Sequence, residues 1–172
     1  MFPSQSNTLE GDIQVKAGVD LTGLEGRLIV VGNSAGKLVA NLPTAITDVP
    51  THVLLDGGAA GTLVSLRPLC SDEQVRIRLN GACNPGDVLV NEDPVANAGA
   101  NAGKVRAVPA GAGAYVGIGK AEEIGVDEQL LLVRPHLHIA RVKSADTITA
   151  AADLAATKAA VLAILQAQGL VV

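Results

Sequence analysis

Two histidines, His136 and His138, flank Leu137 and are the first residues in this chain with potential for chemistry. Residues two apart on a β-strand share a face, so both imidazoles could ligate one metal ion. A stable site needs a third and a fourth ligand, and His52 is the only other histidine. We therefore expect no metal site, and we expect the pair to face solvent or an interface.

The candidate nucleophiles by residue type are Ser65, Cys70 and Ser71. None of them lies in a Gly-x-Ser-x-Gly elbow or in another motif that activates a hydroxyl or a thiol. The acidic cluster at residues 122–123 and 127–128 falls at turns, which is typical of a solvated rim rather than of an acid–base pair. The sequence therefore predicts no catalytic residues and no cofactor.

Two glycine-rich segments have the look of nucleotide-binding loops. Residues 32–37, Gly-Asn-Ser-Ala-Gly-Lys, place three residues between the glycines, and Leu38 follows the lysine. A phosphate-binding loop needs four residues there and a Ser or Thr after the lysine. Residues 111–117 miss the dinucleotide fingerprint in the position of the third glycine, and residues 116–120 look like a strand. We predict a hairpin turn for the first segment and a strand within the second.

The amino-acid composition limits the classes of partner that the chain can bind. The net charge of −4 and the lack of a basic stripe make nucleic acid an unsuitable partner, and one Phe, one Tyr and no Trp leave little for base stacking. Cys70 and Cys83 do not form a Cys-x-x-Cys motif, and we expect two reduced thiols. The N-terminus lacks a basic segment followed by an apolar run, so we expect synthesis in a host cytoplasm without secretion.

The elements that must position these residues read as a mainly β fold. Between residues 11 and 143, short apolar runs alternate with turn clusters rich in Gly, Asn, Asp and Pro, which favours an antiparallel β-barrel or sandwich. The predicted strands are residues 13–17, 27–31, 37–41, 52–55, 61–66, 74–79, 87–91, 104–108, 115–121, 129–134 and 138–142.

Three segments of this domain carry further expectations. Residues 74–79 alternate polar and apolar, so one face of that strand should be wet. Residues 130–133 are apolar on both sides and should be covered on both faces, by the core and by either a helix or a neighbouring copy. Residues 95–103 are low in complexity and read as an exposed loop tip.

The last segment, residues 144–172, is predicted to form an α-helix. It has N-cap side chains at its start, no Gly or Pro between residues 150 and 168, and Gly169 as a stop. Polar residues interrupt it too often for a membrane span. It packs either on the β-domain or on other copies, through a broad apolar stripe formed by Leu154, Val161, Leu162, Ile164 and Leu165.

Residues 1–10 read as an N-terminal arm without a core-forming pattern. Phe2, the only Phe in the chain, sits beside Pro3. A large apolar residue on a polar segment suits an anchor that orders on meeting a partner. Phe2 and Pro3 are therefore candidate contacts to a partner protein or to an adjacent copy, and a frayed terminus is the alternative.

The string of turns and strands in residues 83–93, 103–121 and 127–135, together with the Ala- and Leu-rich residues 153–170, resembles a known family. These residues are similar to the capsid decoration, or cement, proteins of tailed bacteriophages, in which a Gly-Asp turn starts one strand of a small β-barrel. The resemblance covers roughly residues 81–170. It implies no catalytic residues, the major capsid protein as partner, and a place on the virion capsid surface.

We therefore expect a structural virion protein that decorates a phage capsid and bridges neighbouring capsomers. An anchoring domain of a head fibre or tail is the first alternative. A small β-barrel hydrolase with a site built across subunits is the alternative from another class, because such a site needs no linear motif. Self-association is expected in each structural role, with a trimer favoured over a dimer because closed cyclic symmetry buries the apolar surface.

The predicted helix gives the first test. Replacing Ile164 by Asp introduces a charge into the apolar stripe, which should cost several kcal/mol if the position is desolvated. We expect a lower melting temperature if the helix packs on the β-domain, and dissociation in light scattering if it packs on other copies, whereas the parent remains an oligomer at micromolar concentration. An unchanged melting temperature and oligomeric state would show that the helix is an exposed tail.

Overall fold

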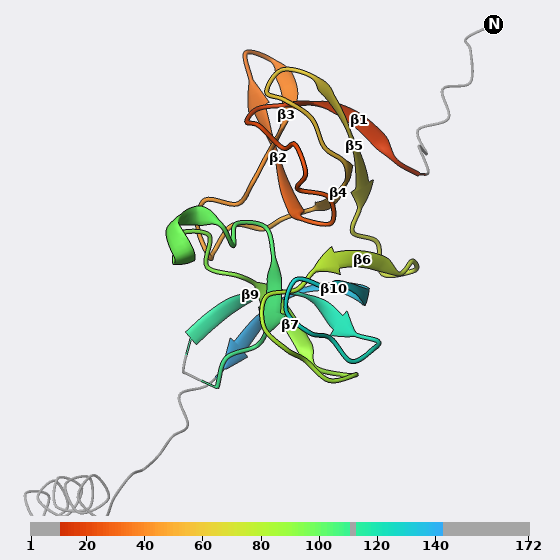
Figure 1. The fold of residues 1–172 in the computed structure, drawn as a ribbon, viewed down its shortest axis with the longest axis vertical. Coiled ribbons are helices and arrows are strands. Elements are labelled where there is room, and N and C mark those ends of the chain that lie inside the picture. Colours follow the sequence, from red (N-terminus) through yellow and green to blue (C-terminus); the bar gives the residue numbers. More distant parts are fainter. Residues whose placement is uncertain (1–10, 111–112, 143–172) are drawn as a thin grey trace, which may run out of the picture.

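A computed structural model describes residues 11–110 and 113–142, and these form two β lobes joined end to end (Figure 1). The N-lobe contains strands β1 to β5 and the C-lobe contains strands β6 to β10. The fold is mainly β and includes a closed barrel, as predicted. The predicted arm and the predicted C-terminal helix, with Phe2, Pro3, Leu154, Val161, Leu162, Ile164 and Leu165, lie outside the described residues.

The N-lobe is a closed five-stranded barrel with the strand order β1-β3-β2-β4-β5, in which β1 also pairs with β5. Its strands are β1 (Ile13–Ala17), β2 (Leu28–Ser34), β3 (Lys37–Asn41), β4 (His52–Asp56) and β5 (Leu63–Pro68). All pairs are antiparallel except β1 with β3, which is parallel. The expectation of a purely antiparallel barrel is wrong at this pair, because β3 returns from its hairpin with β2 alongside β1 to close the barrel.

The β2–β3 hairpin confirms the turn predicted for residues 32–37. Ser34 pairs with Lys37, and the two residues between them, Ala35 and Gly36, have φ angles of 49° and 77°. Two positive φ angles match the twist of the flanking strands. The Asn33 side chain closes the turn by accepting a hydrogen bond from the Gly36 N–H at 2.9 Å. The segment is a tight turn rather than a phosphate cradle.

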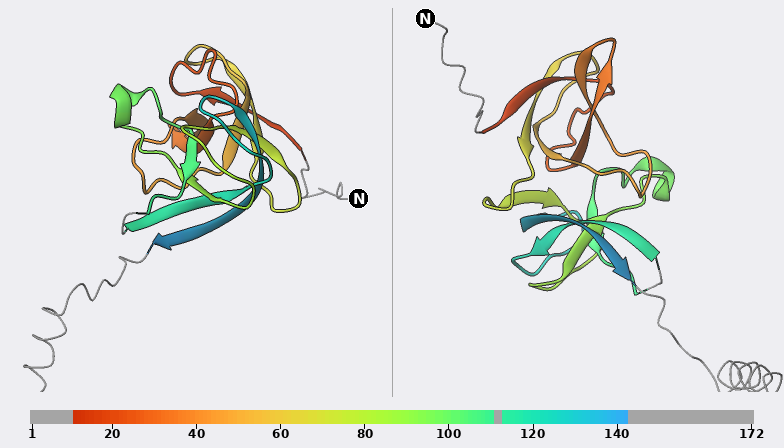
Figure 2. Two further views of the ribbon diagram at one scale, coloured as in Figure 1. Left: turned by 60° about the horizontal axis from the view of Figure 1, so that its bottom comes forward. Right: turned by 180° about the vertical axis from the view of Figure 1, so that it is seen from behind.

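The C-lobe is a five-stranded sheet with the order β6-β10-β9-β7-β8 (Figure 2). Its elements are β6 (Val75–Arg78), β7 (Val88–Asn91), the short 3-10 helix η1 (Ala96–Gly99), β8 (Val105–Ala107), β9 (Gly113–Ala121) and β10 (Leu130–Val142). A bridge from Leu79 to Val105 connects the two outer strands, so this sheet also curls back on itself. In β6 the alternation is confirmed: Val75 and Ile77 are buried and Arg76 is exposed.

Strand β10 replaces two predicted strands. The predicted strands 129–134 and 138–142 are joined in β10 (Leu130–Val142), which pairs with β9 from Val133 to Val142, with a register shift between Pro135 and His138. Three steps on β10, from Pro135 to His138, face two steps on β9, from Gly119 to Gly117, so β10 carries one extra residue. Proline has no N–H for the ladder and is tolerated in a strand at such a bulge. Pro135 therefore lies at a bulge within one strand, where two strands were predicted.

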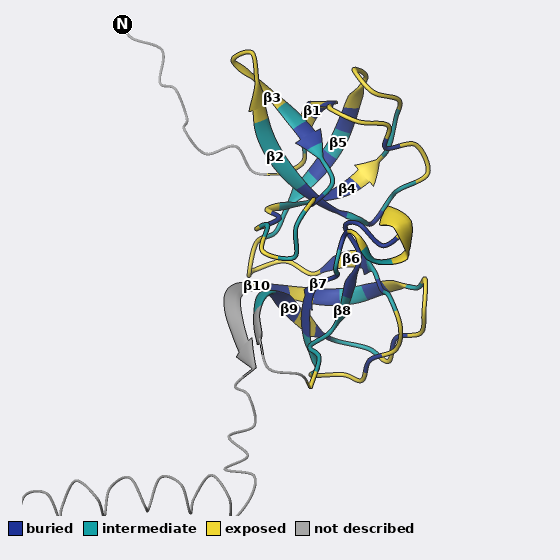
Figure 3. Cartoon of the chain, turned by 90° about the vertical axis from the view of Figure 1, so that its left-hand side faces the viewer, coloured by how far each residue is buried: buried dark blue, intermediate teal, exposed yellow. Residues whose placement is uncertain are grey.

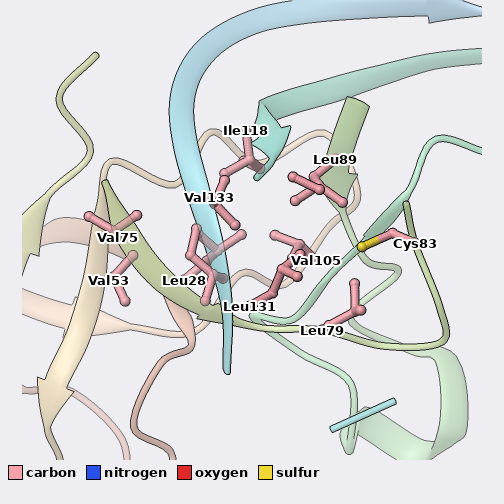
Figure 4. Packing of buried hydrophobic residues seen from close by; sticks show 12 residues of the cluster. Leu28, Val53, Val75, Leu79, Cys83, Leu89, Val105, Ile118, Leu131 and Val133 are labelled. Atoms are coloured by element: carbon pink, nitrogen blue, oxygen red, sulfur yellow. The ribbon is translucent and has the colours of Figure 1, made fainter. Parts of the chain in front are cut away.

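Each lobe has a hydrophobic core, and the core of the C-lobe extends into the N-lobe (Figure 3). The N-lobe core gathers around Leu21, Ile29, Leu54 and Leu66, which are fully buried. Leu28 of β2 and Val53 of β4 point the other way, into the cluster formed by the C-lobe (Figure 4). The other members of that cluster are Val75, Ile77, Leu79, Cys83, Leu89, Val105, Ile118, Ala121, Leu131 and Val133. The lobes therefore share one core where they meet.

The segment predicted as an exposed loop tip, residues 95–103, is only partly one. Val95 is exposed, but Asn101 and Ala102 are buried. The Leu28 N–H donates to the Gly103 carbonyl at 2.7 Å, and the Arg27 guanidinium donates to the Ala102 carbonyl at 2.7 Å. The prediction of a loop tip is wrong for residues 101–103, because the loop supplies backbone acceptors to an N-lobe strand.

Gly103 gives a test of the contact between this loop and the N-lobe. Its φ is +78°, and a Cβ there would lie 2.8 Å from the Leu28 carbonyl oxygen. Gly81 is the matched control, since its φ is +84° and a Cβ would meet nothing within 4 Å. We expect Gly81→Ala to cost about 1–2 kcal/mol from backbone strain. Gly103→Ala should cost about 1–3 kcal/mol more from overpacking. Urea unfolding measures both, and equal losses would contradict a tight joint.

Candidate functional site

An open cleft of about 450 Å³ on the C-lobe brings together three residues that the sequence singles out separately: Ser71, Glu122 and His136. They come from the β5–β6 connection, the end of β9 and the bulge of β10. The remaining lining residues are Gly86, Lys120, Ala121, Arg134 and Pro135. Sequence reasoning missed the cleft because the three contributing segments are distant in the chain.

The hydrogen bonds around the cleft hold the side chains of Glu122 and Ser71 in place. The Arg134 Nε donates to Glu122 at 2.6 Å, and the Gln74 amide donates to the other oxygen of the same carboxylate. The Ser71 hydroxyl donates to the exposed Asp72 carboxylate at 3.3 Å, and an exposed carboxylate is a weak base. The cleft can bind a partner group through charge and hydrogen bonds.

Two cations face each other beside this cleft. Lys120 of β9 and Arg134 of β10 are directly opposite across the strands, and both are exposed. Like charges in this position repel each other. Glu122 offsets the charge of Arg134, whereas Lys120 makes no ion pair within residues 11–110 and 113–142. The cleft therefore presents an uncompensated positive charge on a protein whose net charge is −4, which suits an acidic partner group.

His136 and His138 lie at the bulge of β10, where the backbone register shifts between Pro135 and His138. His136 is exposed, and the side chain of His138 lies outside the described residues. His52 sits on β4, half-buried beside Thr51, and burial lowers the pKa of its imidazole. Where side chains are described, no group of three potential ligands is close enough to hold a metal ion.

The remaining candidate nucleophiles lie apart from this chemistry. Ser65 is half-buried in β5 of the N-lobe, where its backbone pairs with β1. Cys70 and Cys83 are both free thiols, the first exposed and the second buried, as expected of reduced cysteines. Burial raises the pKa of the Cys83 thiol, which keeps it protonated and unreactive at neutral pH.

The acidic cluster, expected to form a solvated rim, makes hydrogen bonds and ion pairs to neighbouring elements. Glu123 accepts hydrogen bonds from the Leu132 N–H at 2.9 Å and from Arg76 at 3.0 Å. Asp127 accepts the Gly81 N–H at 2.8 Å. Glu128 pairs with Lys104, a lysine that is almost fully buried and also donates to Asn101. Asp127 and Glu128 are exposed, as expected of a solvated rim, and each carboxylate in addition ties the β9–β10 turn to a neighbouring element.

No family model matches this chain, and no curated protein sequence matches it. Among solved structures, the chain is similar to the N base of the head fibre protein gp8.5 of bacteriophage phi29. The TM-score is 0.52 at 18% sequence identity, and the match covers 77% of this chain and 95% of that chain. At this identity the likeness establishes a common fold. In the described part of the chain, no helix has the length and apolar character to cross a membrane.

Glu123 gives a test of the hydrogen bonds made by these carboxylates. The Leu132 N–H, assisted by Arg76, lowers the pKa of the Glu123 carboxyl below its ordinary value. A lowered pKa means that the carboxylate stabilises the fold above the unfolded pKa of about 4.3, and that this contribution is lost as the pH falls through the folded value. We expect Glu123→Gln to lower the urea midpoint at pH 7 and to leave the acid-unfolded state unaffected. A midpoint equal to that of the parent at pH 7 would contradict this role.

Proposed function

We propose that this chain is a structural subunit of a bacteriophage head, with the two β lobes as the base of a head fibre. The observation that carries the proposal is the shared fold with the phi29 head fibre base, which extends over 95% of that base. Fold alone does not fix function. The sequence resemblance of residues 81–170 to phage decoration proteins is separate support, because it rests on turn and strand motifs.

The side-chain chemistry is consistent with a non-catalytic role. The hydroxyl of Ser71 is bonded to an exposed carboxylate, and Glu122 is bonded to Arg134 and Gln74. These groups act as structural contacts in the proposal, and the cross-subunit hydrolase becomes the less favoured alternative. The proposal assigns no cofactor and no metal. It names as partners the major capsid protein and other copies of the chain, in a trimer rather than a dimer.

A decoration protein that bridges neighbouring capsomers is the second candidate. The resemblance of residues 81–170 favours it, whereas the fold likeness favours a fibre base. The two differ in what the C-terminal residues 144–172 do: in a fibre base they lead away from the shell, and in a decoration protein they pack within the decorating layer.

Purified virions of the phage that encodes this chain provide the test. We expect the protein among the virion components, with density on the outer surface of the head in cryo-electron microscopy. Density that projects from each attachment point supports a fibre base, and a continuous layer stoichiometric with shell subunits supports decoration. Absence of the protein from virions would overturn both structural roles and favour an enzyme.

Within this proposal the cleft of Lys120 and Arg134 contacts an acidic segment of the shell. Lys120→Glu should weaken binding to capsids lacking this protein by about tenfold, roughly 1.4 kcal/mol, with a smaller salt dependence. Lys37→Glu is the matched control, since Lys37 is an exposed lysine on the β2–β3 hairpin of the other lobe. Equal affinities of the two variants would exclude the cleft as a shell contact.

A further inference from the structure

A groove of about 380 Å³ lies at the junction of the two lobes. Its apolar lining comes from Val53 and Leu55 of β4, Val75 of β6 and Leu132 of β10. The guanidinium-bearing residues Arg67 and Arg76, with Gln74, complete it. An apolar cavity of about 150 Å³ is enough to bind benzene, so this groove has room for an aromatic ring.

The apolar residues of this groove are incompletely covered. Residues 130–133 are apolar on both sides, which indicates that both faces of the strand should be covered. In the structure Leu131 and Val133 are fully buried in the core, but Leu132 on the opposite face is only half-buried. Leu55 across the groove remains 37% exposed. The described residues thus leave an apolar strip between the lobes with room for another group.

The start of β1 is fastened at the rim of this groove. Arg67, which lines the groove, makes a two-point ion pair with Asp12, with Nε to Oδ1 at 2.9 Å and Nη2 to Oδ2 at 3.2 Å. Asp12 directly precedes β1, and the start of β1 lies on the side of the molecule where β5 leads into β6 (Figure 2). Residues 1–10 therefore join the described fold at the groove.

The sequence of the arm supplies a matching occupant. Phe2 is the only Phe in the chain, and ten residue steps separate it from Asp12, a span of at most about 33–36 Å. Pro3 restricts Phe2 to extended backbone conformations, which lowers the entropy cost of docking. The guanidinium groups of Arg67 and Arg76 can stack on an aromatic face, which favours Phe2 over Leu9, the aliphatic residue nearer to the root of the arm.

We propose that the arm of the same chain folds back so that Phe2 and Pro3 occupy the groove between the lobes. The fastening of Asp12 to Arg67 keeps the arm close to the groove and gives it a high effective concentration there. Docking covers Leu55 and Leu132 and adds contacts to both lobes at once. The arm then acts as a strap that fixes the N-lobe against the C-lobe.

A single tryptophan reports on this contact, because the chain contains none. In the full-length Phe2→Trp variant we expect blue-shifted emission that is protected from acrylamide quenching and independent of dilution, including in an Ile164→Asp background. Adding Leu55→Asp, a change at a partly exposed position of the groove, should restore the emission of a water-exposed indole. Leu38→Asp is the matched control, since Leu38 is 59% exposed on β3, away from the groove.

A second measurement uses the native side chain. Phe2→Ala should lower the urea midpoint of the full-length protein, whereas Leu9→Ala should leave it unchanged. Emission of a fully exposed indole in Phe2→Trp, or protection that survives Leu55→Asp, would overturn the proposal. Protection that disappears on dilution would assign the groove to the arm of another copy, and protection that arises only with added capsids would assign Phe2 to the shell.

Discussion

The shared core between the lobes is the constraint on which the rest of the structure depends. Leu28 and Val53 are fully buried among C-lobe residues although they belong to N-lobe strands. Gly26 strengthens this joint through its backbone: its N–H donates to the Leu54 carbonyl at 2.8 Å, and its carbonyl accepts from the Arg78 N–H at 2.7 Å. The φ of Gly26 is +79°, a conformation that L side chains rarely adopt, and a Cβ there would also displace a methyl group of Leu130, so glycine suits this position. The position of one lobe against the other is therefore fixed by packing and by backbone hydrogen bonds together.

Local patterns predicted the strands well, and the closure of the sheets less well. The bounds expected for residues 13–17 and 37–41 agree with β1 and β3, because turn residues and alternation are local signals. The parallel pairing of β1 with β3 and the division into two sheets depend on contacts between distant segments, which a single sequence does not specify. The strands predicted at residues 129–134 and 138–142 are one strand, because the chain continues through a bulge at Pro135.

The candidate cleft illustrates the same limit for function. Ser71, Glu122 and His136 were assessed one at a time, and nothing in their spacing indicates that they line one cleft. The acidic residues show what a local pattern leaves out. Asp127 is exposed, as a carboxylate at a turn usually is, but Glu123 and Asp127 also accept backbone N–H groups that would otherwise lack protein partners. The presence of several acids in one short turn between two long strands is the signal for such contacts.

The two ends of the described fold lie differently with respect to the contact between the lobes. The chain enters the N-lobe at Asp12, held by Arg67 beside the groove between the lobes, and it leaves the C-lobe at Val142. Beyond Val133, β10 pairs with β9 alone, and beyond His138 its partner residues on β9 no longer pair with β7, so the last part of the described fold is a two-stranded ribbon. Such a ribbon has little stability in isolation. The apolar residues 144–172 follow directly from it, and packing of this segment would support the ribbon. The shared core therefore fixes the middle of the described fold, and whatever packs on the ribbon determines the stability of its C-terminal end.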